Sequence, residues 1–401
     1  ANVAREIFTY VLRDMTDKDG GVYSAEDADS EGEEGTFYIW DEKELIEVLG
    51  EENGRIMAKV YGFLEAGNFH DEATGQTIGK NIPYFQDNRT ELAKNFEMSP
   101  DELNELIEAS RKKLFKVREK RIHPLKDDKV LTDWNGLMIA ALALGGQILD
   151  EVEYTNAAEK AAEFVHKKLR NKNGRLMKRY RLGKSGLSPH LDDYSFMVWG
   201  LLNLYEGTFN VKYLSRAIEL SEIMDEDFSD ENGGFFIGSK DAEKLMVRAK
   251  DSYDSAIPSG NSVAVMNLFR LSKMTGDKKW TDLADKTLMA FTDQAKQSPT
   301  GFAHMLTGFM FDLKDPKELV IASNGYDEKV NELVRKIRGA YSPNKVVLFK
   351  DLSDPKDIER IAPWVAAHSI MDDKPTFYVC EDFTCKRPTT NIKTVLNYLG
   401  E

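Results

Sequence analysis

Apolar residues recur with helical spacing along much of this chain. In residues 1–15, one face of a helix would carry Val3, Ile7, Phe8, Val11, Leu12 and Met15. The same spacing, with charges on the opposite face, is clearest in residues 155–169, 211–228 and 279–294. Such a pattern is typical of a helix that buries one face. We therefore predict amphipathic helices over these segments.

Three further segments are more apolar, and they alternate with the amphipathic ones. Residues 133–149, 192–208 and 259–275 are rich in Ala, Gly, Leu and Met, as expected of helices that are buried on most sides. The alternation predicts helical hairpins, each with one internal and one external helix.

Polar glycine turns follow the amphipathic segments, at residues 19–23, 173–176, 232–236 and 300–302. Their intervals are too irregular for a solenoid of fixed period, but they suit stacked helical hairpins. The pattern predicts a toroid, with an inner ring of helices inside an outer ring. An open superhelical stack would give the same pattern. About four hairpins are visible, and no starting Met precedes the first helix, so we expect an incomplete ring cut from a longer protein.

The pattern changes from Lys317 onward. Short apolar runs at 318–322, 345–349 and 376–380 are typical of buried strands, and amphipathic segments follow at 328–338 and 389–399. A strand–helix–strand order implies parallel pairing. We expect two domains: a helical toroid over residues 1–314 and a small α/β unit over residues 315–401. No G-x-G-x-x-G occurs in the sequence, which argues against nucleotide binding.

The amino-acid composition excludes several classes of protein. A hydrophobic content of 41% is enough for a sizeable core, and a net charge of −14 argues against nucleic acid or an anionic membrane as a partner. No run approaches the ~20 apolar residues of a membrane span. We expect a cytoplasmic protein. The two cysteines, Cys380 and Cys385, form no Cys-x-x-Cys motif. In a reducing compartment they are expected to form no disulfide, and they offer too few ligands for zinc.

Five longer motifs resemble one family. They read GVYSAEDADSEGEEG (21–35), DDKVLTDWNGLMI (127–139), LDDY (191–194), AIPSGNSV (256–263) and YVCEDFTC (378–385). They are similar, in this order along the whole chain, to motifs of the YyaL / spermatogenesis-associated protein 20 family of thioredoxin-domain-containing proteins. The resemblance implies a six-hairpin-glycosidase-like (α/α)6 toroid, related in fold to N-acylglucosamine 2-epimerases and sugar hydrolases. It also implies an N-terminal thioredoxin-like domain, which this chain lacks and which is a predicted partner.

The candidate site follows from the geometry of a toroid. The N-termini of parallel inner helices lie on one rim, so Asp133, the Asp192–Asp193 pair and Ser259 should face a common mouth. Capping explains such residues equally well, because Asp and Ser accept backbone N–H bonds at helix starts. Capping does not require the acids and aromatic rings that surround them, which suit a sugar.

We predict that the catalytic residues are Asp133, Asp192, Asp193 and Asp254. The predicted substrate-binding residues are Glu26, Asp27, Asp29, Trp134, Asn135, His190, Tyr194, Asp251, Ser259 and Asn261. The helix dipole should lower the pKa of Asp133 and Asp192, which favours a role as base or hydroxyl-binding anion. Neighbouring carboxylates should raise the pKa of the acids Asp193, Asp251, Asp254 or Glu26.

These residues predict a carbohydrate-active enzyme, either a glycoside hydrolase or an epimerase-like isomerase, with a small carbohydrate as ligand and no cofactor. An epimerase would use imidazoles, and only His190 and His304 fall in or near the rim loops. The alternative is a non-catalytic toroid that binds a peptide or protein and serves a thioredoxin-like domain.

Two stretches of the sequence are strongly charged, one acidic and one basic, and we predict a location for each. Asp27, Asp29, Glu31 and Gly32 match the start of an EF-hand loop, but Tyr38 stands where a bidentate Glu belongs, so no metal is predicted. The flanks at 21–23 and 36–40 are typical of a hairpin with a solvated tip at residues 31–34. The basic residues of 111–121 should form the solvated face of an amphipathic helix.

Overall fold

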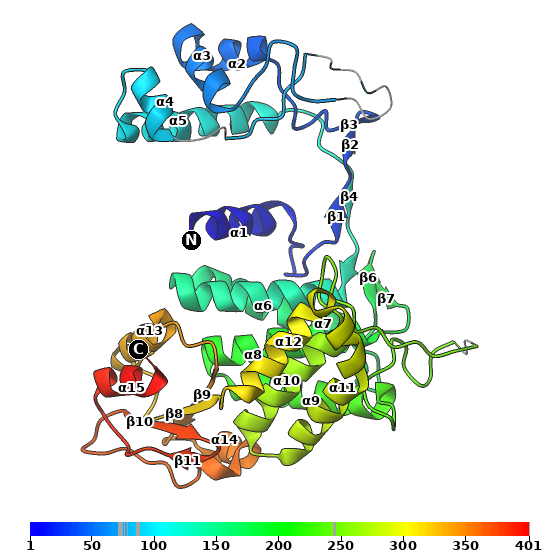
Figure 1. Ribbon diagram of the computed structural model, residues 1–401, viewed down its shortest axis with the longest axis vertical. Helices are drawn as coiled ribbons and strands as arrows, with labels where there is room; N and C mark the ends of the chain where they lie inside the picture. Colours follow the sequence, from blue (N-terminus) through cyan, green and yellow to red (C-terminus); the bar gives the residue numbers. More distant parts are fainter. Residues whose placement is uncertain (71–74, 76, 78, 86–88, 244–245, 401) are drawn as a thin grey trace. The chain divides into compact units, whose positions relative to one another are not determined.

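Helical hairpins follow one another along residues 132–297 (Figure 1). Their helices are α6 (Thr132–Leu149), α7 (Val152–Lys168), α8 (Leu191–Thr208), α9 (Val211–Phe228), α10 (Gly260–Thr275) and α11 (Lys278–Gln297). The apolar helices α6, α8 and α10 pack side by side, and α12 (Ala303–Leu313), which follows the 3₁₀ turn η1 (Pro299–Phe302), packs on α10. Each amphipathic helix packs on the apolar helix before it. This arrangement confirms the predicted fold class, a mainly α toroid of helical hairpins with a small α/β unit.

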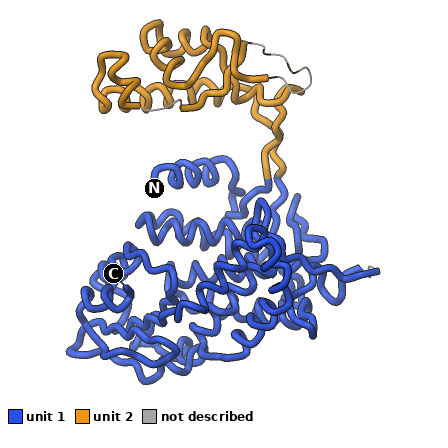
Figure 2. The backbone as a smooth tube through the Cα atoms, viewed as in Figure 1, with its two compact units in different colours: residues 1–24, 128–401 blue, residues 25–127 orange. Residues whose placement is uncertain are grey.

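The computed structural model describes residues 1–400 except 71–74, 76, 78, 86–88 and 244–245. It divides into two compact units (Figure 2): unit 1 comprises residues 1–24 and 128–401, and unit 2 comprises residues 25–127. The sequence pattern did not separate unit 2 from the hairpins. Unit 1 holds both the helical hairpins and the C-terminal α/β region.

The first helix, α1 (Asn2–Asp14), packs on the first hairpin through Phe8. That ring lies 4.7 Å from the ring of Tyr154 in α7 and close to Gly145 of α6. The turn that follows lies against Lys160 and Phe164 of α7. The turn after α9 packs on α11 in the same way, with Gly233 against Lys286 and Gly234 against Phe291. By this repeat, α1 corresponds to the outer helix of a hairpin that precedes α6.

The fourth predicted glycine turn, at residues 300–302, lies in the 3₁₀ turn η1, but the other three share one backbone design. Each of these three is closed by an isolated β-bridge, and the bridges join Thr16 with Val22, Arg170 with Leu176, and Ser229 with Phe235. In each turn the side-chain oxygen of Asp17, Asn171 or Asp230 accepts the backbone N–H two residues later. Such side chains stabilise a turn by imitating a backbone acceptor. The repeated sequence pattern therefore corresponds to the same set of turn hydrogen bonds at each of these positions.

The first two inner helices cross very closely. A Cβ added at Gly136 of α6 would lie 2.5 Å from the carbonyl carbon of Phe196 in α8. One added at Gly200 of α8 would lie 2.8 Å from the carbonyl oxygen of Gly136. Glycine is therefore required on both sides of this crossing for steric reasons.

Unit 2 is a small helical body with its own core. Its helices are α2 (Glu42–Leu49), α3 (Glu51–Val60), α4 (Arg89–Asn95) and α5 (Pro100–Arg118). The side chains of Leu45, Met57 and Leu103 are fully buried in it. On α5, Lys112, Lys113 and Lys116 are exposed while Leu114 is buried, which confirms the predicted solvated basic face for these lysines. Arg121, by contrast, is 19% exposed and donates to the carbonyls of Phe37 and Ile39.

The acidic stretch forms two short ribbons in unit 2. Strand β1 (Ala25–Glu26) pairs with β4 (Lys126–Asp127), and β2 (Asp29–Ser30) pairs with β3 (Glu33–Glu34). The hairpin predicted from residues 21–23 and 36–40 is therefore wrong. Its predicted tip is right, because residues 31–34 are exposed and Glu31 and Gly32 have the positive φ angles of a tight turn.

Two smaller sets of strands complete unit 1. The first is the three-stranded sheet of β5 (Val130–Leu131), β6 (Arg179–Arg181) and β7 (Lys184–Gly186). The second is the C-terminal sheet, in the order β11-β10-β8-β9, from β8 (Lys317–Ser323), β9 (Lys345–Asp351), β10 (Thr376–Glu381) and β11 (Thr384–Cys385). The C-terminal sheet is accompanied by α13 (Glu328–Gly339), α14 (Lys356–Ile361), η2 (Pro363–Val365) and α15 (Ile392–Leu399).

Strands β8 and β9 are parallel, as predicted from the strand–helix–strand order, whereas β10 is antiparallel to β8. In the β10–β11 hairpin, Cys380 and Cys385 stand opposite each other and form a disulfide. The expectation that they remain unpaired is wrong, because cross-strand register brings the two sulfur atoms together. Among the described helices, none is long and apolar enough to cross a membrane.

Candidate functional site

A lysine joins the N-termini of two inner helices. Lys178 lies between the Gly174 turn and β6, and its Nζ is 2.5 Å from Oδ2 of Asp133 and 3.4 Å from Oδ1 of Asp193. Burial alone would lower the pKa of Lys178, but Asp193 and Asp133 outweigh it and raise that pKa above its ordinary value. The lysine is therefore charged and holds the two carboxylates together.

Asp193 is the centre of this arrangement. It has no exposed surface, and it accepts backbone N–H bonds from Asp133 (3.0 Å) and His190 (2.7 Å). Burial raises its pKa, and Asp133 adds to the rise, against the opposing effects of Lys178 and the His190 amide. The predicted direction of this pKa shift is confirmed. Asp193 joins the start of α6 to the start of α8.

Asp192 is the partly exposed acid of the pair. It lies so close to the start of α10 that a Cβ at Gly260 would overlap its Oδ1. Burial raises the pKa of Asp192 to about 6, with Lys178 opposing the rise and Asp133 and Asp251 adding to it. The prediction that the helix dipole lowers this pKa is wrong, because desolvation outweighs the dipole. Asp192 is thus suited to donate a proton near neutral pH.

Replacing Asp192 by asparagine is expected to change how stability depends on pH. The folded pKa of about 6 lies above the ordinary value of 3.8, so between these values the native state binds more protons than the unfolded chain. The stability contributed by this group therefore falls as pH rises through that window. Urea unfolding should show the Asp192→Asn variant gaining at most about 3 kcal/mol on the wild type between pH 4 and 7.5. Asp282→Asn, at an exposed position of α11, should follow the wild type, and parallel pH profiles of Asp192→Asn and wild type would contradict the raised pKa.

Asp254 joins the next two inner helices. Its carboxylate accepts the backbone N–H of Ser259, before α10, and of His304, in α12, at 2.9 and 2.8 Å. Ser259 in turn caps α10 by accepting the N–H of Ser262. Both side chains therefore serve the helix starts, as the capping alternative requires. Asp251, at the same loop, is exposed.

Two asparagines of the predicted site hold the glycine turns. Asn135 accepts the N–H of Val22 and donates to its carbonyl, and Asn261 does the same with Phe235. Both side chains are fully buried. Tyr194 plays the corresponding part in the remaining turn, because its buried hydroxyl accepts the backbone N–H of Leu176 at 3.0 Å. The structure thus gives all three residues a structural role at the rim.

Aromatic and imidazole rings also lie at the helix starts. Trp134, in the first turn of α6, is 43% exposed, and His190 is exposed directly before α8. Burial, followed by Lys178, lowers the pKa of His190. His304 of α12 lies 5.1 Å from the ring of Trp199 in α8. Its Nε2 is buried, and among the described residues it has no hydrogen-bond partner.

The remaining predicted site residues lie in unit 2. Glu26, Asp27 and Asp29 belong to strands β1 and β2 and the link between them. Their proximity to the helix starts of unit 1 stays a prediction.

Sequence reasoning missed Lys178 and Trp199. The repeated glycine turn could have pointed to Lys178. This lysine comes two residues after Leu176, whose backbone N–H is bound by the hydroxyl of Tyr194 at the rim. The sequence gives a weaker indication for Trp199, since an aromatic residue within an apolar helix usually belongs to the hydrophobic core. Potential metal ligands gather elsewhere: His368, Cys380 and Cys385 form such a group in the C-terminal sheet.

Comparisons with known proteins show homology along nearly the whole chain. No family model matches it. The chain is 32% identical to spermatogenesis-associated protein 20 of Homo sapiens over 420 residues, covering 98% of this chain and 53% of that protein. It is 28% identical to an uncharacterized protein of Caenorhabditis elegans, covering 98% and 56%. The chain therefore spans about half the length of these relatives. A GH76 alpha-mannanase structure from Bacteroides thetaiotaomicron is 15% identical, with a TM-score of 0.41 and coverage of 54% and 59%.

Proposed function

We propose that this chain, a homologue of spermatogenesis-associated protein 20 over nearly all of its length, binds a carbohydrate at the starts of α6, α8 and α10. We further propose that it acts on this ligand by acid–base catalysis, as a glycoside hydrolase or an epimerase-like isomerase. The observation that carries the proposal is Asp192, a partly exposed carboxyl whose pKa is raised to about 6 among other charged groups.

The roles follow from the environment of each group. Asp192 is the proton donor, because a carboxyl with a pKa near the working pH is both protonated often enough and acidic enough. Asp133 and Asp193, held by Lys178, position the helix starts, and Asp133 adds to the raised pKa of Asp192. Trp134 offers an exposed ring on which the C–H face of a sugar can stack.

Hydrolysis and epimerisation would use different partners of Asp192. A hydrolase needs a second carboxylate to activate water. The exposed Asp251 is the candidate for this role, because its charge contributes to the raised pKa of Asp192. An epimerase needs a second group to return a proton. His304, whose buried Nε2 has no hydrogen-bond partner in the described part of the chain and which has the ring of Trp199 beside it, would suit that role.

The test is a titration of the chain with a panel of neutral, N-acetylated and acidic sugars, followed by calorimetry and by NMR of the sugar products. We expect binding of at least one class, with Asp192→Asn retaining binding and losing turnover by about 100-fold or more. Trp134→Ala should weaken binding itself. Asp282→Asn is the control for a surface carboxylate. Absence of binding to every sugar of the panel would overturn the proposal.

A second function, binding of a peptide or protein, is favoured by a different observation. Helices α11 and α12 enclose an apolar cavity of about 490 Å³. Met289 and Phe309 line it, and they are 75% and 43% exposed. An exposed apolar surface of this kind suits a protein partner, such as the thioredoxin-like domain that the family resemblance implies. In that case Asp192→Asn would leave function unchanged, whereas Met289→Asp would abolish it.

A further inference from the structure

The disulfide of the C-terminal sheet joins one exposed and one buried cysteine. Cys380 of β10 and Cys385 of β11 are opposite each other in register, and their sulfur atoms are 2.01 Å apart. Cys380 has no exposed surface, whereas Cys385 is exposed. Of the two residues, Cys385 is therefore the one accessible to an incoming thiol. Disulfide exchange requires this kind of access to one sulfur.

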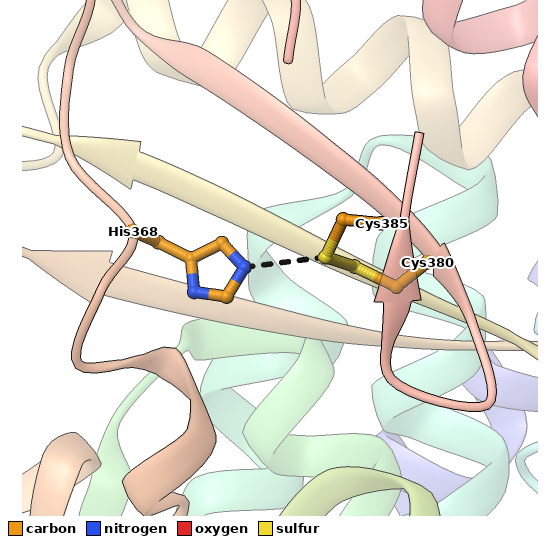
Figure 3. Close-up of side chains that lie close together, drawn as sticks. All are labelled: His368, Cys380 and Cys385. Carbon is orange, nitrogen blue, oxygen red and sulfur yellow. Dashed lines mark hydrogen bonds between the residues drawn. A yellow bond between two sulfur atoms is a disulfide. The ribbon is translucent and has the colours of Figure 1, made fainter. Parts of the chain in front are cut away.

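A buried histidine stands against the sulfur of the exposed cysteine (Figure 3). Nε2 of His368 lies 3.5 Å from Sγ of Cys385, and the side chain is only 7% exposed. The rings of Tyr378 and Trp364 pack edge-on against the imidazole, at 4.3 and 5.6 Å, and hold its orientation. All three potential ligand atoms lie within 4.8 Å of one another. The imidazole therefore contacts Sγ of Cys385 and lies within 4.8 Å of Sγ of Cys380.

The imidazole is suited to act as a base. Burial lowers the pKa of His368, Lys350 lowers it further, and the nearby carbonyl of Val365 offsets part of this effect. Lys350 is itself held by Glu359 at 2.8 Å. A lowered pKa leaves the ring neutral at pH 7, with a lone pair available to take a proton.

A purely structural role explains this disulfide poorly. Disulfides stabilise most when they close long loops, and this one joins residues only five positions apart. The hairpin is already held by other contacts: the Phe383 N–H donates to Oε2 of Glu318 at 3.3 Å, and the Phe383 ring packs on Trp364. Lys273 lies 3.4 Å from both Glu318 and Asp382. Opening the disulfide would therefore leave the hairpin in place.

A metal site explains the group less well than redox chemistry does. The described part of the chain supplies only three ligands here, whereas structural zinc sites use four.

We propose that Cys380, Cys385 and His368 form a thiol–disulfide exchange centre that accepts two electrons from a dithiol. In the first step a thiol of the donor attacks Sγ of Cys385 while its proton passes to Nε2 of His368. The bond between Cys385 and Cys380 breaks, its electron pair stays on Sγ of Cys380, and that thiolate takes the proton from the imidazolium.

The second step releases the donor. Its remaining thiol gives a proton to Nε2 of His368 and attacks the donor sulfur of the mixed disulfide. Cys385 leaves with the electron pair and takes that proton. The donor departs as a cyclic or internal disulfide, the chain is left with two thiols, and His368 returns to its neutral form. This activity is independent of the carbohydrate proposal.

The test is reduction of the folded chain by dithiothreitol, followed by maleimide labelling and mass spectrometry. We expect two labels per chain while the near-ultraviolet circular dichroism stays unchanged, and re-oxidation by oxidised dithiothreitol. His368→Ala should slow reduction by about tenfold at pH 7. That difference should vanish at about pH 10, where the donor thiols are already ionised. A merely structural role of His368 would not produce this dependence on the ionisation of the donor.

The control is His123→Ala, at a partly exposed histidine of unit 2, which should reduce at the wild-type rate. Cysteines that stay oxidised until the chain is unfolded by denaturant would overturn the proposal. So would equal rates for His368→Ala and wild type at pH 7. Stoichiometric binding of added zinc sulfate by the reduced chain, lost in His368→Ala, would reassign the group to a metal.

Discussion

Replacing Asp193 by alanine is expected to lower the free energy of unfolding by about 3 to 5 kcal/mol. The carboxylate is fully buried and accepts the backbone N–H groups of Asp133 and His190. Removing it would leave the buried N–H of Asp133 and the partly buried N–H of His190 without this acceptor, and would leave Lys178 paired with Asp133 alone. Urea unfolding of the variant, with the slope compared to that of the wild type, measures the loss.

Two variants separate this effect from a general loss of charge. Asp193→Asn keeps one acceptor oxygen and should lose less stability than Asp193→Ala. Asp282→Ala, at an exposed aspartate of α11, should change stability by less than about 0.5 kcal/mol. A loss below about 1 kcal/mol for Asp193→Ala would contradict its role as the link between α6 and α8.

Replacing Gly136 by alanine is expected to cost about 3 kcal/mol or more, although alanine favours a helix. The added Cβ would lie 2.5 Å from the carbonyl carbon of Phe196 and 2.6 Å from the nitrogen of Met197. These are backbone atoms, which cannot rotate away, so α6 and α8 would have to separate. The separation should also disturb Lys178 and the carboxylates at the helix starts. Thermal and urea unfolding measure the loss.

Gly339 provides the matched control for that substitution. It ends helix α13, and no described atom lies within 4 Å of the position its Cβ would occupy. Gly339→Ala should therefore leave stability unchanged or raise it slightly. Equal effects of the two substitutions would show that the close crossing of α6 and α8 is not required for stability.

Much of the helical arrangement follows from the sequence pattern. The apolar segments at 133–149, 192–208 and 259–275 correspond to α6, α8 and α10. Their composition reports how much of each helix is buried, and helical spacing reports which face is buried, so neither needs knowledge of distant residues. Unit 2 was not predicted, because a division into units is set by which residues contact one another in space.

The candidate site was predicted in part. Helix starts on one rim explain why Asp133 and Asp193 come together. Lys178 was missed because it comes from a loop whose path depends on the turn before it. The pKa of Asp192 was predicted in the wrong direction, because local sequence indicates the helix dipole but not how much of the side chain is removed from water.

By itself the sequence determined the alternation of inner and outer helices, the glycine turns, and the positions where carboxylates start inner helices. These depend on neighbours within a few turns of the chain. Only the tertiary structure decided that Asn135 and Asn261 hold the turns, that Asp192 is desolvated, and that Cys380 meets Cys385 beside His368. Those outcomes depend on contacts and burial that the folded chain alone creates.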